Sequence, residues 1–150
     1  MKKQKQNILN VSLTLIAIYL YSFTANNIET EILGFNSFKF LITIAVLIQF
    51  LIFLPSFMFQ TEKFYDLTGS LTYISVTSIA YFSIENPSTT DTILFLYVII
   101  WAGRLGIFLF RRINKDGKDE RFDKAKKKFF WFLQYWMGQA AWVVFTAGAS

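Results

Sequence analysis

Long uncharged intervals alternate with short charged segments along this chain. Five intervals of 18 to 23 residues hold at most one Asp, Glu, Lys or Arg each: residues 6–28, 40–61, 67–84, 92–110 and 129–150. A helix needs about 20 apolar residues to cross a bilayer. Backbone amides in hydrocarbon must be bonded within a helix or a closed barrel, and the alternating pattern of barrel strands is absent. We therefore expect an all-α, multi-pass transmembrane helical bundle with about five spans, near residues 8–25, 39–59, 67–84, 92–110 and 129–148.

The composition narrows the class of protein further. Hydrophobic residues make up 54% of the 150 residues and charged residues only 17%, which excludes a water-soluble globule. We expect residues 1–150 to form a single transmembrane domain. The absence of Cys and His excludes disulfides, thiol nucleophiles, Cys/His metal sites and imidazole bases, and no metal site is predicted. Acid–base chemistry would fall to carboxylates, Lys, Arg, Tyr or amides.

The distribution of Lys and Arg predicts the orientation. Thirteen of them lie in the amino-terminal tail and the second and fourth loops, whereas the opposite side has Lys39 alone. Because cytoplasmic loops are enriched in Lys and Arg, the amino terminus and these loops are expected in the cytoplasm, most simply at a bacterial inner membrane. A cleaved signal peptide is the alternative for the first 25 residues. Phe23, where a small residue would precede cleavage after Ala25, favours a retained span.

The fourth loop, residues 111–128, carries the net charge of the protein. It reads RRINKDGKDERFDKAKKK, with nine basic and four acidic residues, while the rest of the chain sums to zero. One interpretation is an orienting loop that contacts anionic membrane lipid. The other is a site for a phosphate-bearing ligand, since a guanidinium presents paired donors to phosphate. Asp116-Gly117 predicts a turn that brings the two arms of the loop together. No nucleic-acid partner is expected.

Arg104 is the only charge in the interior of an expected span, where a charge costs at least about 2.5 kcal/mol. It lies about six residues, roughly 9 Å, from the basic loop, so its side chain can extend toward the lipid headgroups. Alternatively, Trp101, Arg104, Phe108 and Arg111 share one helical stripe that would form an aromatic and cationic wall. Both interpretations stay open.

A second stripe begins the third span. Asp66, Ser70, Tyr73 and Thr77 share one helical face. Asp66 is suited to stabilise a helix amino terminus, and the alternative is an acid or donor pair, Asp66 and Tyr73, that faces Arg104 across the bundle.

Smaller features of the spans predict helix packing. Gln134 and Gln139 are expected to hydrogen-bond a neighbouring helix, and Pro55 to kink the second span. Small residues allow helices to approach closely, so tight helix contacts are expected at three glycines: Gly103, Gly106 and Gly138.

Three segments, in order, resemble a known family: TEKFYDLTGSLTYI at 61–74, WAGRLGIFLFRRINKDGKDERFD at 101–123 and WFLQYWMGQAAW at 131–142. Together they cover about half of the chain. They look like an uncharacterised group of membrane proteins related to the steroid 5-alpha-reductases, in a superfamily that also includes the isoprenylcysteine carboxyl methyltransferases. The segment from Trp101 to Asp123 is the most specific of the three.

This resemblance implies a membrane oxidoreductase that binds NADPH from the cytoplasm. It would reduce a carbon–carbon double bond conjugated to a carbonyl in a flat, lipid-soluble small-molecule substrate. The cofactor carries the hydride chemistry, while the protein orients it and polarises the carbonyl oxygen. On this reading Arg104, Arg111 and Arg121 approach the phosphates, and Tyr73, assisted by Asp66, is the donor.

Two departures from the family pattern limit this expectation. Steroid reductases have a Gln-Glu pair before a Leu-Pro-Ser-Phe-like segment, whereas Ile52-Phe53 precede residues 54–57 here. The family's carboxy-terminal half, with an Arg-His-Pro-Asn-Tyr-like segment and most cofactor contacts, has no counterpart. We therefore expect the amino-terminal portion of a longer reductase-like protein, and whether it is active alone stays open. The alternatives are an S-adenosylmethionine-dependent intramembrane methyltransferase and a non-catalytic membrane protein whose basic loop binds lipid or a partner.

Overall fold

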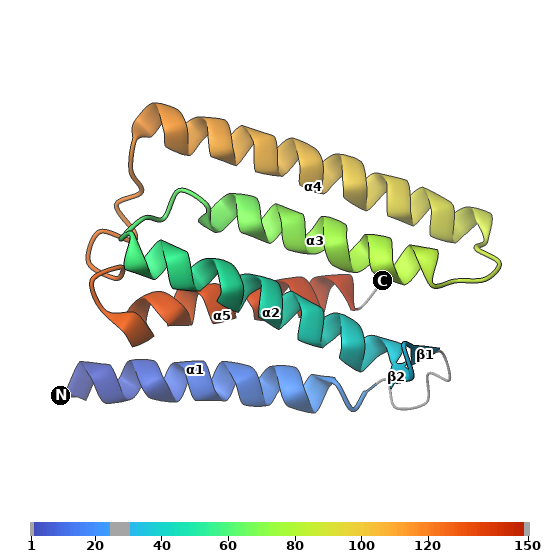
Figure 1. Ribbon diagram of the computed structural model, residues 1–150, viewed down its shortest axis with the longest axis horizontal. Coiled ribbons are helices and arrows are strands. Elements are labelled where there is room, and N and C mark those ends of the chain that lie inside the picture. Colours follow the sequence, from blue (N-terminus) through green and yellow to red (C-terminus); the bar gives the residue numbers. More distant parts are fainter. Residues whose placement is uncertain (1, 25–30, 149–150) are drawn as a thin grey trace.

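The computed structural model describes residues 2–24 and 31–148 and is mostly helical. Its helices lie side by side along the long axis of the molecule (Figure 1). In chain order the elements are α1 (Lys2–Tyr21), β1 (Glu31–Ile32), β2 (Phe35–Asn36), α2 (Ser37–Met58), α3 (Tyr65–Phe82), α4 (Thr89–Asp116) and α5 (Phe129–Ala147). The strands form a small antiparallel hairpin in which Ile32 pairs with Phe35. The expectation of a helical protein is confirmed for the described residues.

Two of these helices, α2 and α4, are long and apolar enough to cross a membrane by their length and composition. The bounds of the helices differ from the expected spans by a few residues, and the last residue of the first expected span, Ala25, lies outside the described residues. The number of spans and their orientation stay predictions.

Side chains and backbone geometry set the helix ends. Asn36 caps α2 by accepting a hydrogen bond from the backbone N–H of Lys39 at 3.2 Å. Ser88 and Asp91 form a reciprocal capping box at the start of α4. Gly117 ends α4 in the left-handed conformation, with φ at 79°, and donates to the carbonyl of Ile113. Residues 111–116, expected in a loop, are therefore helical, because nothing before Gly117 interrupts the helix.

The helices form a layered bundle (Figure 1). Helix α3 lies between α4 and the pair formed by α2 and α5, and α1 packs along α5. Helix α4 packs on α3 at the edge of the bundle, so its opposite face is uncovered by the described residues. We call the end where α2 connects to α3 and α4 connects to α5 the loop end, and the other the hairpin end.

Helix α5 supplies much of the core. Phe132 and Trp136 are fully buried and contact Phe53 of α2, with ring centroids 5.8 and 6.3 Å apart. Edge-to-face and tilted arrangements of this kind are favoured by the ring quadrupoles. A second buried cluster lies nearer the hairpin end: Ile18, Ile42, Ala45, Val76, Ala140, Ala141 and Val144.

The glycines divide into tight and open positions. A Cβ at Gly106 would lie 2.7 Å from the Cβ of Ser70, so the expected close contact of α4 with α3 is confirmed there. At Gly103 and Gly138 an added Cβ meets nothing within 4 Å, and the same expectation is wrong for both. One unexpected tight position is Gly69, where a Cβ would lie 2.5 Å from Nε2 of Gln139.

Candidate functional site

Asp66 lies in the first turn of α3, at the loop end, and faces α4. Its Oδ2 is 3.6 Å from Nη2 of Arg112, so the ion-pair partner is Arg112, two helical turns along α4 from the Arg104 that the sequence pattern placed opposite it. Asp66 does not cap the helix, since Phe64 is the N-cap residue and α3 has no side-chain cap. Burial raises the pKa of the Asp66 carboxyl, although Arg121 and Arg112 oppose the shift.

Arg121 is held inside the loop that follows α4. Its Nε lies 3.0 and 2.9 Å from the two carboxylate oxygens of Asp119, and its side chain remains 56% exposed. The hydrogen bonds from Arg121 hold the pKa of Asp119 below its ordinary value. A predicted phosphate-binding arginine therefore has an internal partner and an accessible face.

Glu62, which the sequence pattern did not single out, anchors this loop to the bundle. Its carboxylate is 4% exposed, accepts a hydrogen bond from the backbone N–H of Asp119 at 3.0 Å and lies 2.7 Å from Nζ of Lys126. Phe122 of the same loop is buried against Tyr65, with ring centroids 4.8 Å apart. The basic loop is thus packed against the bundle. Glu62 lies in segment 61–74, one of the three segments that resemble the known family. This resemblance is the signal by which the sequence could have indicated Glu62.

Tyr73 lies near the middle of α3, at the junction with α4 and α5. Its hydroxyl is hydrogen-bonded to the hydroxyl of Thr146 on α5. Its ring meets Trp101 of α4 edge to face, with centroids 5.3 Å apart. The predicted donor therefore joins three helices, and an aromatic residue of the predicted α4 stripe reaches it.

Arg104 and Arg111 lie on exposed positions of α4. Arg104 lines a shallow hollow formed by residues of α4 itself, among them Tyr97 and Phe108. No ion pair joins either arginine to Asp66 within the described residues. The structure thus gathers Asp66 with Arg112 and Arg121 at the loop end and leaves Arg104 and Arg111 along the outer face of α4.

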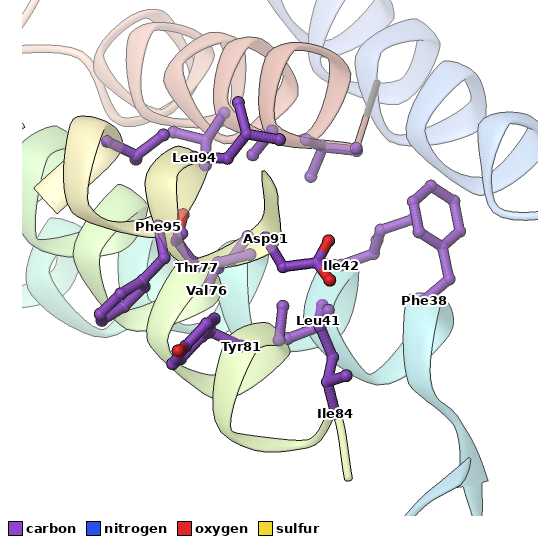
Figure 2. A pocket seen from close by; sticks show the side chains of 17 residues that line it. Phe38, Leu41, Ile42, Val76, Thr77, Tyr81, Ile84, Asp91, Leu94 and Phe95 are labelled. Carbon is purple, nitrogen blue, oxygen red and sulfur yellow. The ribbon is translucent and has the colours of Figure 1, made fainter. Parts of the chain in front are cut away.

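An apolar cavity of about 280 Å³ lies among α2, α3, α4 and α5 toward the hairpin end. Figure 2 shows Val76 and Thr77 of α3 and Asp91 of α4 among the side chains that line it. Tyr81 stacks on Phe95 at 4.3 Å between ring centroids. Val76 and Thr77 follow Tyr73 by one turn of α3, so the cavity begins next to the predicted donor.

A second concave surface lies between α3 and α5, nearer the loop end. It is an open depression of about 320 Å³ lined by Tyr65, Gln134, Tyr135, Gly138, Gln139 and Trp142; we call it the amide hollow. The side-chain oxygens of Gln134 and Gln139 are buried and have no hydrogen-bond partner among the described residues. For these two oxygens, the expected hydrogen bond to a neighbouring helix is absent. Because both oxygens are buried, a ligand in the hollow would satisfy them only after the amide planes turn toward it.

A family model described as "Protein of unknown function (DUF1295)" matches residues 52–149. The chain belongs to this family. No curated protein and no solved structure matches the chain. The matched segment of this DUF1295 chain begins in α2 and includes α3, α4 and α5, so it contains every site residue described above.

In this DUF1295 protein the candidate groups follow one another along α3 from the loop end. Asp66 comes first with its arginines, then Gly69 beneath Gln139 of the amide hollow, then Tyr73, and then the apolar cavity at Val76. From the loop end toward the hairpin end, α3 therefore passes charged, amide, hydroxyl and apolar surroundings in turn.

Proposed function

We propose that this protein is an integral membrane reductase that uses NADPH to reduce an enone in a lipid-soluble small molecule. The order of sites along α3 carries the proposal. A dinucleotide needs cationic groups for its phosphates and hydrogen-bonding groups for its ring, and a lipid-soluble substrate needs an apolar cavity beside a donor. The resemblance of three segments to steroid 5-alpha-reductase-like proteins supports the same function.

The residues at the loop end suit the cofactor. Arg121 keeps an accessible guanidinium face while Asp119 fixes its position, and Arg111 and Arg104 extend from the outer face of α4. The buried oxygens of Gln134 and Gln139 offer acceptors without partners. When bound, NADPH supplies the hydride. These arginines would bind its phosphates on the cytoplasmic side of a bacterial inner membrane.

Tyr73 is the proposed donor to the substrate carbonyl. Thr146 fixes the Tyr73 hydroxyl in position, and Trp101 restricts its ring. A hydroxyl that donates to the carbonyl oxygen stabilises the negative charge that develops there and delivers a proton. Asp66 precedes Tyr73 by seven residues, roughly 10 Å along the helix, so its assistance would be electrostatic and would not involve contact.

The substrate would occupy the apolar cavity beyond Tyr73. Its walls are apolar over most of their extent, and two of its polar side chains are engaged with protein groups: Tyr81 bonds to Thr92 at 3.0 Å, and Asp91 accepts hydrogen bonds from Ser88. Binding there would depend on the apolar body of the substrate, since apolar walls provide little orientation by hydrogen bonding. Membrane lipid would surround the bundle and deliver the substrate.

Titration of the purified full-length protein in nanodiscs tests the function directly. We expect saturable binding of NADPH by calorimetry and oxidation of NADPH when a lipid-soluble enone is added. Binding of S-adenosylmethionine in place of NADPH would assign the protein to the methyltransferase alternative. Binding of neither would reject both enzymatic functions.

One observation favours a non-catalytic function as the second candidate. Several charges of the α4–α5 loop are paired internally, as Arg121 is with Asp119 and Lys126 with Glu62, which is the arrangement of a structural loop. The remaining exposed lysines, among them Lys124 and Lys127, would then contact anionic lipid. Stronger flotation with vesicles that contain phosphatidylglycerol than with neutral vesicles, together with no cofactor binding, would support it.

A further inference from the structure

The amide hollow enters the proposed function only through the unpartnered oxygens of Gln134 and Gln139. Two facts make it unusual for a site between packed helices: it presents two glutamine side chains, and both of their oxygens lack hydrogen-bond partners among the described residues. We propose that Gln134 and Gln139 recognise a planar ring that carries an exocyclic amide. Resting on the proposed function, this ring is the nicotinamide of NADPH.

The amide oxygens can reach a ligand with a small torsional change. They are buried in the present arrangement, but the last torsion of a glutamine side chain is broad and allows the amide plane to turn. A buried acceptor without a partner is unfavourable, so a ligand N–H that satisfies it gains affinity. A carboxamide also has its own carbonyl oxygen, and it can exchange two hydrogen bonds with a glutamine amide.

The walls of the hollow suit a flat ring. Trp142, which is 67% exposed, and Tyr135 present aromatic surfaces from α5, and Tyr65 contributes from α3. Tyr65 donates a hydrogen bond to the carbonyl oxygen of Tyr135 at 3.0 Å, which fixes one wall. Offset stacking of a planar heteroaromatic on such surfaces is favourable.

Gly138 keeps the hollow open. A Cβ at this position meets nothing within 4 Å, so the lack of a side chain leaves space that no other described residue fills. In the middle of a helix glycine is less favourable than alanine by about 1 kcal/mol, so packing gives no reason for its presence here. A side chain at position 138 would therefore start in open space and extend into the hollow.

The hollow also lies where a reacting ring is needed. Gln139 rests on Gly69, with its Nε2 2.5 Å from the position of an added Cβ, and Tyr73 stands one turn further along α3. Thr146, the partner of Tyr73, follows Trp142 by one turn of α5. A ring in the hollow would therefore lie between the arginines of the loop end and the donor.

The experiment compares two ligands on matched variants of the full-length protein in nanodiscs. NADPH carries the ring, and 2′-phospho-ADP-ribose carries the phosphates without it. Gly138→Leu fills the hollow, while Gly103→Leu, at a second helical glycine whose Cβ would be free of contacts, is the control. Gln139→Leu removes one amide at similar volume.

We expect the dissociation constant of NADPH to be at least tenfold larger in Gly138→Leu and Gln139→Leu than in the wild type. The affinity for 2′-phospho-ADP-ribose should stay unchanged within twofold. Gly103→Leu should match the wild type for both ligands. Unfolding midpoints of Gly138→Leu and Gly103→Leu within a few degrees of the wild type would establish that the fold is intact. Unchanged NADPH affinity in Gly138→Leu overturns this inference and leaves the proposed function standing.

If the wild-type protein binds no NADPH, the proposed function is rejected instead. Nicotinamide alone is then the probe, with quenching of tryptophan fluorescence as the readout. Saturable quenching that Gly138→Leu abolishes would support the hollow as a site for an amide-bearing ring. Absence of quenching in the wild type would overturn it.

Discussion

The carboxylate of Glu62 lies 2.7 Å from the ammonium of Lys126, which joins the connection between α2 and α3 to the loop between α4 and α5. The two side chains are 4% and 18% exposed. The same carboxylate accepts the backbone N–H of Asp119, so one buried residue fixes both ends of the loop segment. The position of Arg121 in this loop depends on this contact.

Loss of the Glu62 charge should destabilise the bundle. Glu62→Gln removes the nearer and more buried of the two carboxylates beside Lys126 and leaves the half-exposed Asp123, 3.8 Å away, as its counter-ion. Breaking a buried pair costs about 3 kcal/mol, which is the upper limit here. The free energy of unfolding, measured by titration with SDS in mixed micelles, should fall accordingly. Glu85→Gln, at an exposed carboxylate between α3 and α4, should have no effect. The double variant Glu62→Gln/Lys126→Met should recover part of the loss; a further decrease would argue against a direct pairing.

Asp66 and Asp119, two of the carboxylates at the loop end, should change the stability with pH in opposite directions. The pKa of Asp119 is lowered in the folded protein, so its stabilising contribution is present above the unfolded value of about 3.9 and is lost as the pH falls through the folded pKa. The pKa of Asp66 is raised, so stability declines as the pH rises from about 3.9 through its folded pKa.

These signs predict different outcomes for the two amide variants. At neutral pH, Asp119→Asn should lower the unfolding midpoint and Asp66→Asn should leave it equal or higher. Thermal unfolding from pH 3 to pH 8, followed by circular dichroism, provides the measurement. A lower midpoint for Asp66→Asn at pH 7 would mean that the ion pair with Arg112 outweighs burial.

Tyr73→Phe should separate catalysis from binding. It removes the hydroxyl that bonds to Thr146 and is proposed to donate to the substrate, while it keeps the ring against Trp101. We expect kcat to fall about 100-fold or more, with the dissociation constant of NADPH unchanged. Tyr81→Phe is the matched control for kcat, because Tyr81 lines the proposed substrate cavity and makes a similar hydrogen bond to Thr92, away from the donor position. Equal kcat values in the two variants would exclude Tyr73 as the donor.

Replacement of a glycine by alanine should have opposite effects on stability at the tight and the open positions. Gly106→Ala places a methyl group 2.7 Å from the Cβ of Ser70 and should cost about 1–3 kcal/mol as α4 is pushed from α3. The methyl group added in Gly103→Ala has no atom within 4 Å, so this variant should stabilise the protein by up to about 1 kcal/mol through helix propensity. Comparison of SDS unfolding midpoints checks both. Equal midpoints would show that α4 does not approach α3 this closely.

Arg104→Leu tests the outer face of α4. If Arg104 binds a phosphate of NADPH, the affinity for the cofactor should fall about tenfold, as expected for loss of a charge-assisted hydrogen bond. Calorimetry with NADPH provides the measurement, and Lys39→Leu, at the opposite end of the expected spans, serves as the charge control. Unchanged affinity would assign Arg104 to the lipid headgroups instead.

Local features of the sequence were enough to predict the helices. Uncharged intervals predicted segments that are helical, and only the ends shifted, because capping by Ser88 and the left-handed conformation of Gly117 act within a few residues. The face shared by Asp66 and Tyr73 could also be predicted, since it follows from the helical repeat alone. In contrast, the expected helix contacts at Gly103 and Gly138 were wrong, because a sequence does not reveal whether a neighbouring helix lies opposite a small residue.

Partners across helices were decided by the tertiary structure alone. Helix rotation and the offset between α3 and α4 place Arg112 opposite Asp66, and the course of the α4–α5 loop brings Lys126 to Glu62. The sequence by itself determined where helices form and which residues share a face, because hydrophobicity, caps and helical periodicity are local properties. The tertiary structure decided which faces meet, which charges pair and where the amide hollow and the apolar cavity lie, because these depend on packing between segments far apart in the chain.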